Sequence, residues 1–521
     1  MPQARKQSPE DQAIMASVEE AKQARIRFKS VYNLFFDLAA PWRTRVGEES
    51  DKRNPRSPAE QDDIFDTTLQ NAVDDWASDC ADEFTPSYKP WTKYKVVGGP
   101  AKMSKAVQDQ IMQFATDHME LIYDRIRESA FEEQSQEAYV DFAIAPMAMD
   151  WPYTKAGEPL KCEHVPISEL LILPSPFNGP GDRFRIRKIA IKHLDIMWPK
   201  ADWSFLGSKA ARVKSDNQVE VVQAHTRDWS NRSEEVWTYR LLVNGHTMLK
   251  PEVSRGPGSC RLVVARPRVS QPSAIGIGFA NKALAPARTL NKLAYLELKR
   301  QGKIVDPPVG YSDDGTANIE GGIEAGDWIE FGEGFQIEEL APQTDAREVW
   351  FNQEDLRMQV KQALFQDKPF QRGDTPPTAA QWLSEEERNA RRKGFPRARA
   401  IREWVLPTLR RVEWILRERG EVQDQKIEGE LVRFEPISPM SRASDLNEVQ
   451  LVNQHVDLFV SRFGPEAARY YNMTEMMSKT AEKMGTDSIV LRTEEEVREE
   501  EERQIMLQAA ASGAAPGAGP Q

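Results

Sequence analysis

Residues 275–309 read IGIGFANKALAPARTLNKLAYLELKRQGKIVDPPV and contain the clearest helical pattern in the chain. From Gly278 to about Arg300, apolar side chains recur every three or four residues, the spacing that places them on one face of an α-helix. They are Ala280, Ala283 or Leu284, Ala287, Leu290, Ala294 and Leu298. Pro286 lies inside the pattern and removes one backbone donor, so it should kink or delay the helix. The Asp-Pro-Pro sequence that begins at Asp306 should end it.

Downstream of this helix, strand-like and helical patterns alternate. Residues 310–340 are punctuated by glycine and predict short strands, and a second helix is expected from about Arg347 to Leu364. The polar loop QDKPFQRGDTPP, residues 366–377, separates that helix from the longest helical stretch, Thr378 to Arg419. Three residues inside this stretch should break or bend it: Gly394, Pro396 and Pro407.

Upstream, helices come first and strands follow. The predicted helices are Ala16–Leu38, a helix capped by Ser57 with Pro58 at its first position and stopped by Pro86, Ser104–Arg127, and Phe131–Ala145. Between Pro146 and Arg268 we expect strands, among them LLIL (170–173), IRKIAIKHL (186–194) and VEVVQAH (219–225). In WTYRLLVNGHTML, Asn244 and Gly245 can supply the positive φ angles of a type I′ hairpin turn. The chain is therefore predicted to be α+β.

The composition is that of an acidic globular protein. The chain has 521 residues, of which 40% are hydrophobic and 29% charged, and its mean hydropathy is −0.61. No apolar run approaches the roughly 20 residues that a membrane span needs, and the N-terminus has no secretory core, so we expect no membrane partner. A net charge of −12 disfavours a tight nucleic-acid binder. An acidic protein surface can still line a path along which DNA slides, because it repels the DNA phosphates at every register.

The cysteines and histidines suggest neither a disulfide framework nor a metal centre. Cys80, Cys162 and Cys260 are far apart in sequence, which favours reduced thiols, and Cys80 falls in an apolar helical stripe typical of a core. The six histidines show no HxH or HxxxH spacing. We therefore predict no metal site.

No motif for catalysis or cofactor binding stands out. Gly276-Ile277-Gly278 lacks a third glycine, because Asn281 occupies that position, and no phosphate-loop lysine follows. A flexible lead-in to the helix is the better interpretation. Acidic residues are abundant, but none has the supporting motif that a nuclease site would need. We predict no catalytic residues and no cofactor.

Four segments, in this order, resemble the head-to-tail connector, or portal, proteins of podovirus-type bacteriophages. They are IFDTTLQNAVDDWASDCADEFTPSYKPW (64–91), FEEQSQEAYVDFAIAPMAMDW (131–151), the stretch 275–309, and TPPTAAQWLSEEERNARRKGFPRARAIREWVLPTLRRVEWIL (375–416). The third is the most specific, with Thr-Leu-Asn-Lys-Leu on a helix followed by Asp-Pro-Pro. In the fourth, Gln381 stands near the place where the family has Glu. The resemblance covers roughly residues 20 to 425.

The resemblance implies the α+β portal fold and an order of parts along the chain. These are a flexible N-terminus at 1–15; a wing of helices with a strand-rich subdomain at 16–275; a first stem helix at 276–302; a clip at 303–344; a second stem helix at 345–365; a channel loop at 366–377; a long wing helix region at 378–435; a helical crown at 436–505; and a disordered tail at 506–521.

The resemblance also implies a function. The chain would form a dodecameric ring at one capsid vertex of the virion, after synthesis in the host bacterial cytoplasm. Double-stranded DNA would pass through the ring during packaging and ejection without sequence-specific contacts. The ring would meet major capsid and scaffolding proteins, dock the terminase large subunit, and then carry the tail adaptor protein. The lumen should be mostly acidic, with a few basic rings.

The resemblance places candidate contact residues in the channel loop and on the stem. Lys368 and Arg372, repeated around a ring, would face DNA phosphates without reading bases; an ordinary solvated loop is the alternative. Cations on the first stem helix could pair with acids on the second across a subunit boundary, or simply within the chain. The cations are Arg288, Lys292, Lys299 and Arg300, and the acids are Glu348, Glu354 and Asp355.

Two alternative functions remain open from the sequence. One is another structural ring or tail component of a phage, although adaptors are usually much shorter. The other is a metal-dependent nucleic-acid enzyme, for which the sequence offers no motif.

Overall fold

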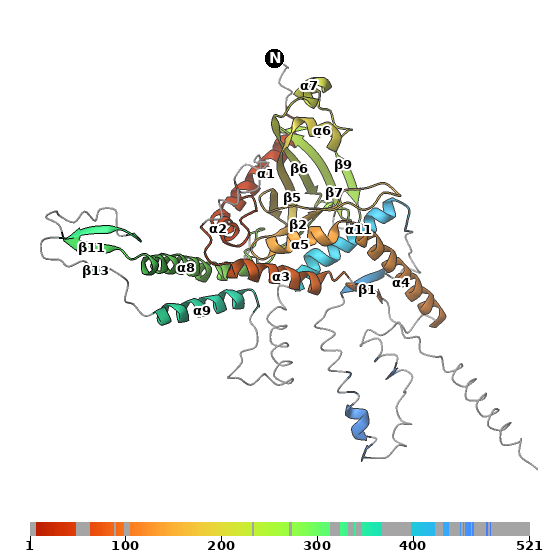
Figure 1. The fold of residues 1–521 in the computed structure, drawn as a ribbon. Coiled ribbons are helices and arrows are strands. Elements are labelled where there is room, and N and C mark those ends of the chain that lie inside the picture. The colour runs from red at the N-terminus through yellow and green to blue at the C-terminus, as the bar shows by residue number, and fades with distance from the viewer. Residues whose placement is uncertain are drawn as a thin grey trace, which may run out of the picture. The chain divides into compact units, whose positions relative to one another are not determined.

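The computed structural model confirms an α+β chain (Figure 1). It describes residues 7–47, 63–87, 90–97, 105–231, 234–269, 273–312, 324–331, 338–339, 346–366, 398–422, 431–436 and scattered positions between 449 and 480. The chain divides into two units, Met1–Pro436 and Ile437–Gln521. The described positions of the second unit are all helical. The rest of the predicted crown and the predicted tail lie outside the described residues.

The first unit begins with helices that cover two sheets. They are α1 (Pro9–Ile26), α2 (Lys29–Ala39), α3 (Thr68–Phe84), α4 (Lys105–Arg127) and α5 (Phe131–Phe142). Helix α5 packs on a three-stranded antiparallel sheet in the order β10 (Leu262–Ala265), β2 (Met147–Asp150), β3 (Glu163–His164), and α3 packs on α5. The predicted helices at Ser104–Arg127 and Phe131–Ala145 are confirmed within a few residues.

Three predictions about the N-terminal helices are wrong. Residues 9–15, expected in the flexible N-terminus, begin α1, because the Ser8 side chain caps it by accepting from Asp11 N at 3.0 Å. The Ala16–Leu38 helix is two helices, because the chain turns at residues 27–28. The helix predicted from Ser57, which itself lies outside the described residues, begins only at Thr68. Residues 64–67 are not helical, because backbone groups of this stretch bond to a side chain of another helix, described below.

A six-stranded antiparallel sheet forms the strand-rich region. Its strands are β4 (Leu170–Pro174), β5 (Pro180–Ala190), β6 (Gln218–Arg227), β7 (Val236–Val243) and β8 (His246–Thr247) in that order, with β9 (Glu252–Arg255) paired to β7. The hairpin turn is confirmed: Asn244 and Gly245 have φ angles of 51° and 75°. The run IRKIAIKHL is strand only as far as Ala190, after which the short helix α6 (Ile191–Met197) begins. Helix α7 (Lys209–Val213) precedes β6.

One large core joins the helices to the three-stranded sheet. Trp404, Trp151 and Tyr139 are among its fully buried side chains. Trp404 belongs to a π-helical segment, Ile401–Val405, that leads into α11 (Leu406–Glu418). The prediction that Pro407 disturbs this helical stretch is confirmed. A proline has no N–H to donate to the carbonyl four residues back, and the π-helical segment lies directly before Pro407. Gly394 and Pro396 lie outside the described residues.

Helix α11 is fastened to the sheets by a buried arginine. Arg411 donates from Nε and Nη2 to the Trp151 carbonyl, at 3.2 and 2.9 Å, and from Nη1 to the carbonyls of Gly258 and Ser259. Burial lowers its pKa to about 10. A further strand pair, β1 (Thr92–Val97) with β14 (Leu431–Pro436), is antiparallel and ends the described part of this unit.

Candidate functional site

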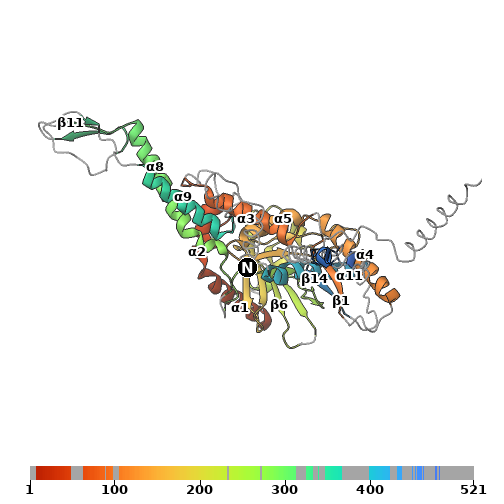
Figure 2. The ribbon, with the colours of Figure 1, turned by 90° about the horizontal axis from the view of Figure 1, so that it is seen from below.

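Two helices lie side by side and extend away from the sheets, with short strands at their far end (Figures 1 and 2). We call this feature the arm. It consists of α8 (Leu284–Val305), β11 (Val309–Ser312), β12 (Trp328–Phe331), β13 (Glu338–Glu339) and α9 (Ala346–Ala363). Strand β11 pairs in parallel with β12 and antiparallel with β13. The sequence-predicted helix, strands and second helix are thus present in this order.

The start and end of α8 follow from its prolines. A 3-10 turn, Phe279–Lys282, precedes the helix, so Pro286 falls in the first helical turn, where its missing N–H has no partner to lose. The expected delay is therefore confirmed. At the other end Asp306 N still bonds to the Gly302 carbonyl at 2.9 Å, and Pro307 prevents a further turn.

The two glycines before α8 allow close backbone packing. A side chain at Gly276 would overlap the Arg268 carbonyl, and one at Gly278 would overlap the Ala143 carbonyl. Gly278 N donates to the Ile144 carbonyl at 2.7 Å, which holds the base of the arm against the end of α5. The predicted flexible lead-in is wrong: glycine is needed here because the two backbones touch.

Asn291, in the centre of the Thr-Leu-Asn-Lys-Leu motif, ties α8 to the segment that precedes α3. Its Oδ1 accepts from the backbone N–H groups of Phe65 and Asp66, at 2.7 and 3.1 Å, and its Nδ2 donates to the Asp63 carbonyl at 2.8 Å. Asp66 in turn accepts from Arg357 of α9 at 3.2 Å. The segment 63–66 therefore links both arm helices, a role that the sequence did not reveal.

The four stem cations all lie on α8. Arg300 pairs with Glu297 at 3.0 Å on the same helix, and Lys299 Nζ lies 5.0 Å from the centre of the Tyr295 ring. A hydrogen bond with Tyr295 raises the pKa of Lys299. Arg288 and Lys292 are exposed and have no carboxylate within ion-pair distance in the part of the chain that the structure describes.

The acidic candidates and the channel-loop candidates are placed only in part. On α9, Glu354 pairs with Arg357 at 2.6 Å and Asp355 accepts from Gln359 at 2.8 Å. Glu348 belongs to the same helix. The partners of Glu354 and Asp355 are on the same helix, and pairing of the three acids with another copy stays a prediction. Lys368 and Arg372 lie outside the described residues.

The arm exposes large apolar side chains. On α8, Leu298 is 52% and Val305 86% exposed, and Trp328 on β12 is 68% exposed; Leu296, Ile304 and Met358 are also exposed. At 100° of rotation per residue, Leu296 and Leu298 point to opposite sides of α8, whereas Leu298 and Val305 share one side. Single exposed apolar residues are ordinary, but a group on one thin element indicates surfaces that another molecule covers.

The described residues define the possible metal ligands and the state of the thiols. Among them, no three His, Cys, Asp or Glu side chains are grouped to hold a metal ion. No described helix is long and apolar enough to cross a membrane. None of the three cysteines, all of which are described, forms a disulfide. Cys80 is buried on α3, as predicted, and burial raises the pKa of Cys162 to about 12. A thiol with a raised pKa is a poor nucleophile, because little of it is in the reactive thiolate form.

A family comparison covers nearly the whole chain. The model of the family described as bacteriophage head to tail connecting protein matches residues 11–491. The chain belongs to this family. No curated protein matches this chain.

Among solved structures, 68 chains match this chain. One is a chain from the virion of a native gene transfer agent particle, with 10% sequence identity, a TM-score of 0.30, and coverage of 77% of this chain and 84% of that one. At that TM-score the likeness carries no weight for the fold or the function.

Proposed function

We propose that this connector is a portal protein. Copies form a closed, dodecameric ring at one vertex of the capsid, and double-stranded DNA passes through it during packaging and ejection. The ring docks the terminase large subunit and later the tail adaptor, and it sits among capsid and scaffolding proteins. Membership of the connecting-protein family supports this role, and the chain contributes no catalysis of its own.

The observation that carries the proposal is the pair of uncovered sides on α8. A ring requires each copy to present two different surfaces, one to each neighbour. In the proposed ring, Leu296 on one side, and Leu298 with Val305 on the other, would make these contacts, and their exposure supports this. Fully burying one Leu or Val side chain contributes about 1.5–3 kcal/mol, so a few per interface matter for assembly.

The charges of the arm support the same assembly. Arg288 and Lys292 are exposed on α8, and Glu354 and Asp355 are exposed on α9. In a ring, α8 of one copy can face α9 of the next, which brings these cations to these acids. Such rim pairs set the register of contact more than its strength. Lys368 and Arg372 remain our candidates for the basic rings that touch DNA phosphates.

The test exploits the two-sidedness of the arm. Leu296→Glu and Leu298→Glu should each prevent ring closure, because a buried charge is costly. Mixed together, the two variants should form dimers and nothing larger, since each retains one intact side. Ile196→Glu is the control, because Ile196 is also an exposed apolar side chain but lies on α6, away from the arm. Rings from all three variants would contradict the proposal.

A DNA-cleavage assay separates the portal from the enzymatic alternative. We expect no sustained cleavage when the purified chain is incubated with DNA and Mg²⁺. Cleavage that a single carboxylate substitution abolishes would favour a metal-dependent nuclease instead.

A further inference from the structure

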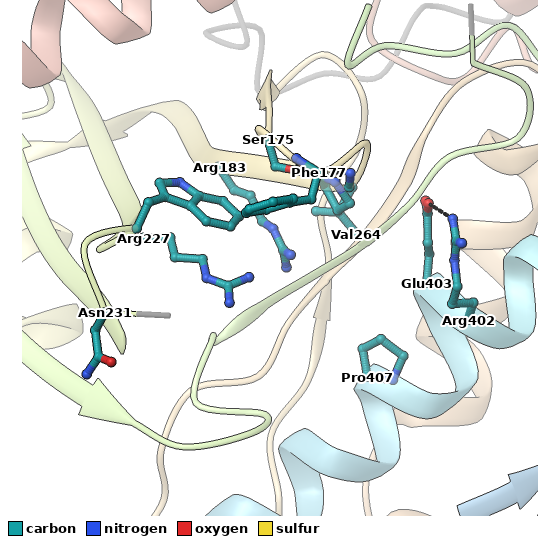
Figure 3. Close-up of a pocket in the computed structure, with 12 residues that line it drawn as sticks. Ser175, Phe177, Arg183, Arg227, Asn231, Val264, Arg402, Glu403 and Pro407 are labelled. Carbon is teal, nitrogen blue, oxygen red and sulfur yellow. Dashed lines mark hydrogen bonds and ion pairs between the residues drawn. The ribbon is translucent and has the colours of Figure 1, made fainter. Parts of the chain in front are cut away.

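A hollow of about 510 Å³ opens between the six-stranded sheet and the π-helical segment, away from the arm (Figure 3). The turn between β4 and β5 and the end of β6 form one wall. Arg402 and Glu403, on the π-helical segment, and Pro407, at the start of α11, form the other. Its volume is within the range of pockets that bind small ligands or a few side chains.

The two walls are fastened together by Arg266. Its Nη2 donates to the Glu403 carboxylate and to the Asn178 carbonyl of the β4–β5 turn, both at 2.8 Å. Ser175 Oγ closes the same turn by accepting from Gly179 N at 2.8 Å, and Asn178 adopts a positive φ of 60°. The hollow is therefore preformed, which lowers the entropic cost of binding.

Two arginines enter the hollow from the sheet without a counter-ion. The Arg227 guanidinium lies 4.2 Å from the Trp229 ring centre, and that of Arg183 lies 4.9 Å from Trp237. The Nε of each is buried and has no hydrogen-bond partner among the described residues. No carboxylate there lies within ion-pair distance of either guanidinium; the neighbouring Asp182 accepts instead from the backbone N of Arg227, at 2.9 Å.

The remaining charges leave the hollow positive. Glu403 is its one lining acid among the described residues, and Arg266 already neutralises it at 2.8 Å. Arg402 adds a third cation at the rim, 3.5 Å from Glu403. Arg183 Nη1 donates to the Leu262 carbonyl, but neither Arg183 nor Arg227 has a carboxylate partner among the described residues. A positive hollow in a chain of net charge −12 is a local feature, and an anion is the ligand that these two arginines fit.

The mouth of the hollow also presents aromatic rings. Phe177 is 74% exposed, and its ring centre lies 5.9 Å from that of Trp229. Arginines that bind an anion beside this aromatic pair suit a ligand in which a carboxylate lies next to an apolar side chain. A DNA duplex carries its phosphates on a wide convex surface, which a recess of this size cannot follow. Arginine clusters recognise acidic peptide motifs in this way.

We propose that this hollow is a docking site for a short acidic peptide segment of a partner protein. A Glu or Asp carboxylate lies between Arg183 and Arg227, and a neighbouring apolar side chain rests against Phe177 and Trp229. The proposal does not depend on ring formation, because each copy contributes the whole site.

The test uses a fluorescein-labelled peptide, Glu-Glu-Phe-Glu-Glu-Leu, and anisotropy with the full chain. Saturable binding is expected at or below about 1 mM, and replacing each Glu of the peptide by Gln should abolish it. Arg227→Gln should weaken binding at least about tenfold, since a charge-assisted pair is lost. Phe177→Ser, on an exposed turn, should weaken it as well. Arg255→Gln removes the same charge from an exposed site on β9 and should have no effect.

Three results would overturn the proposal. The first is the absence of saturable peptide binding. The second is an equal loss of affinity in Arg227→Gln and Arg255→Gln, which would show a general charge effect. The third is tighter binding of a single-stranded oligonucleotide than of the peptide, weakened by the same substitutions, which would assign the hollow to nucleic acid.

Discussion

The buried ion pair between Arg266 and Glu403 offers a sharp test of how α11 is held on the sheets. Arg266 is 2% and Glu403 6% exposed, and three hydrogen bonds join them, from Arg266 N and Nε at 3.1 Å and from Nη2 at 2.8 Å. Glu403→Gln keeps the size of the side chain but leaves the arginine charge buried and uncompensated. Breaking a buried pair in this way costs about 3–5 kcal/mol.

Urea unfolding at one fixed protein concentration measures this cost, because assembly would otherwise shift the apparent stability. The double variant Arg266→Met, Glu403→Leu is the matched control. It removes both charges together, so it should be less destabilised than Glu403→Gln alone. A loss below about 0.5 kcal/mol in Glu403→Gln, the range of an ordinary surface substitution, would refute the reasoning.

Three further predictions concern other parts of the first unit. Asn291→Ala leaves three backbone groups of the segment 63–66 without their hydrogen-bond partner, so it should lower the free energy of unfolding by about 2 kcal/mol in urea titrations. An unchanged midpoint would contradict the role given to this side chain. Burial lowers the pKa of His225 from 6.5 to about 3, so the unfolded chain binds a proton that the folded chain does not. Stability should therefore fall as the pH drops below 6.5, by about 2 kcal/mol between pH 7 and pH 5, and His225→Gln should lose less; equal losses would contradict it. Because burial raises the pKa of Cys162 to about 12 and that of Cys260 as well, the native chain should react with Ellman's reagent far more slowly than the denatured chain. Rapid titration of any native thiol would argue against this packing.

Much of the fold is readable from local patterns. Helical periodicity located α4, α5 and α8, and the Asn244-Gly245 pair located the β7–β8 turn. Local patterns failed where distant residues decide the outcome. The start of α3 is one example, because Asn291 is more than two hundred residues away from the backbone groups that it binds.

The candidate sites differ in how much the sequence could reveal. The order of helix, short strands and second helix in the arm follows from local sequence patterns and could be predicted. The contacts of the stem residues that the resemblance indicated stay a prediction. Gly276 and Gly278 were misjudged, because the carbonyls of Arg268 and Ala143 that exclude a side chain there are remote in sequence. The arginine hollow could not be predicted at all. Arg183, Arg227 and Arg402 come from three separate segments, and only the folding of the sheet against α11 brings them together.

The central claim, a ring of identical copies, is tested most directly by negative-stain microscopy with mass photometry on the same sample. The portal function predicts rings whose central hole is wide enough for duplex DNA. Their mass should be near that of twelve 59.3 kDa copies, about 710 kDa. A monodisperse 59.3 kDa monomer at every salt concentration, with and without scaffolding protein, would contradict it.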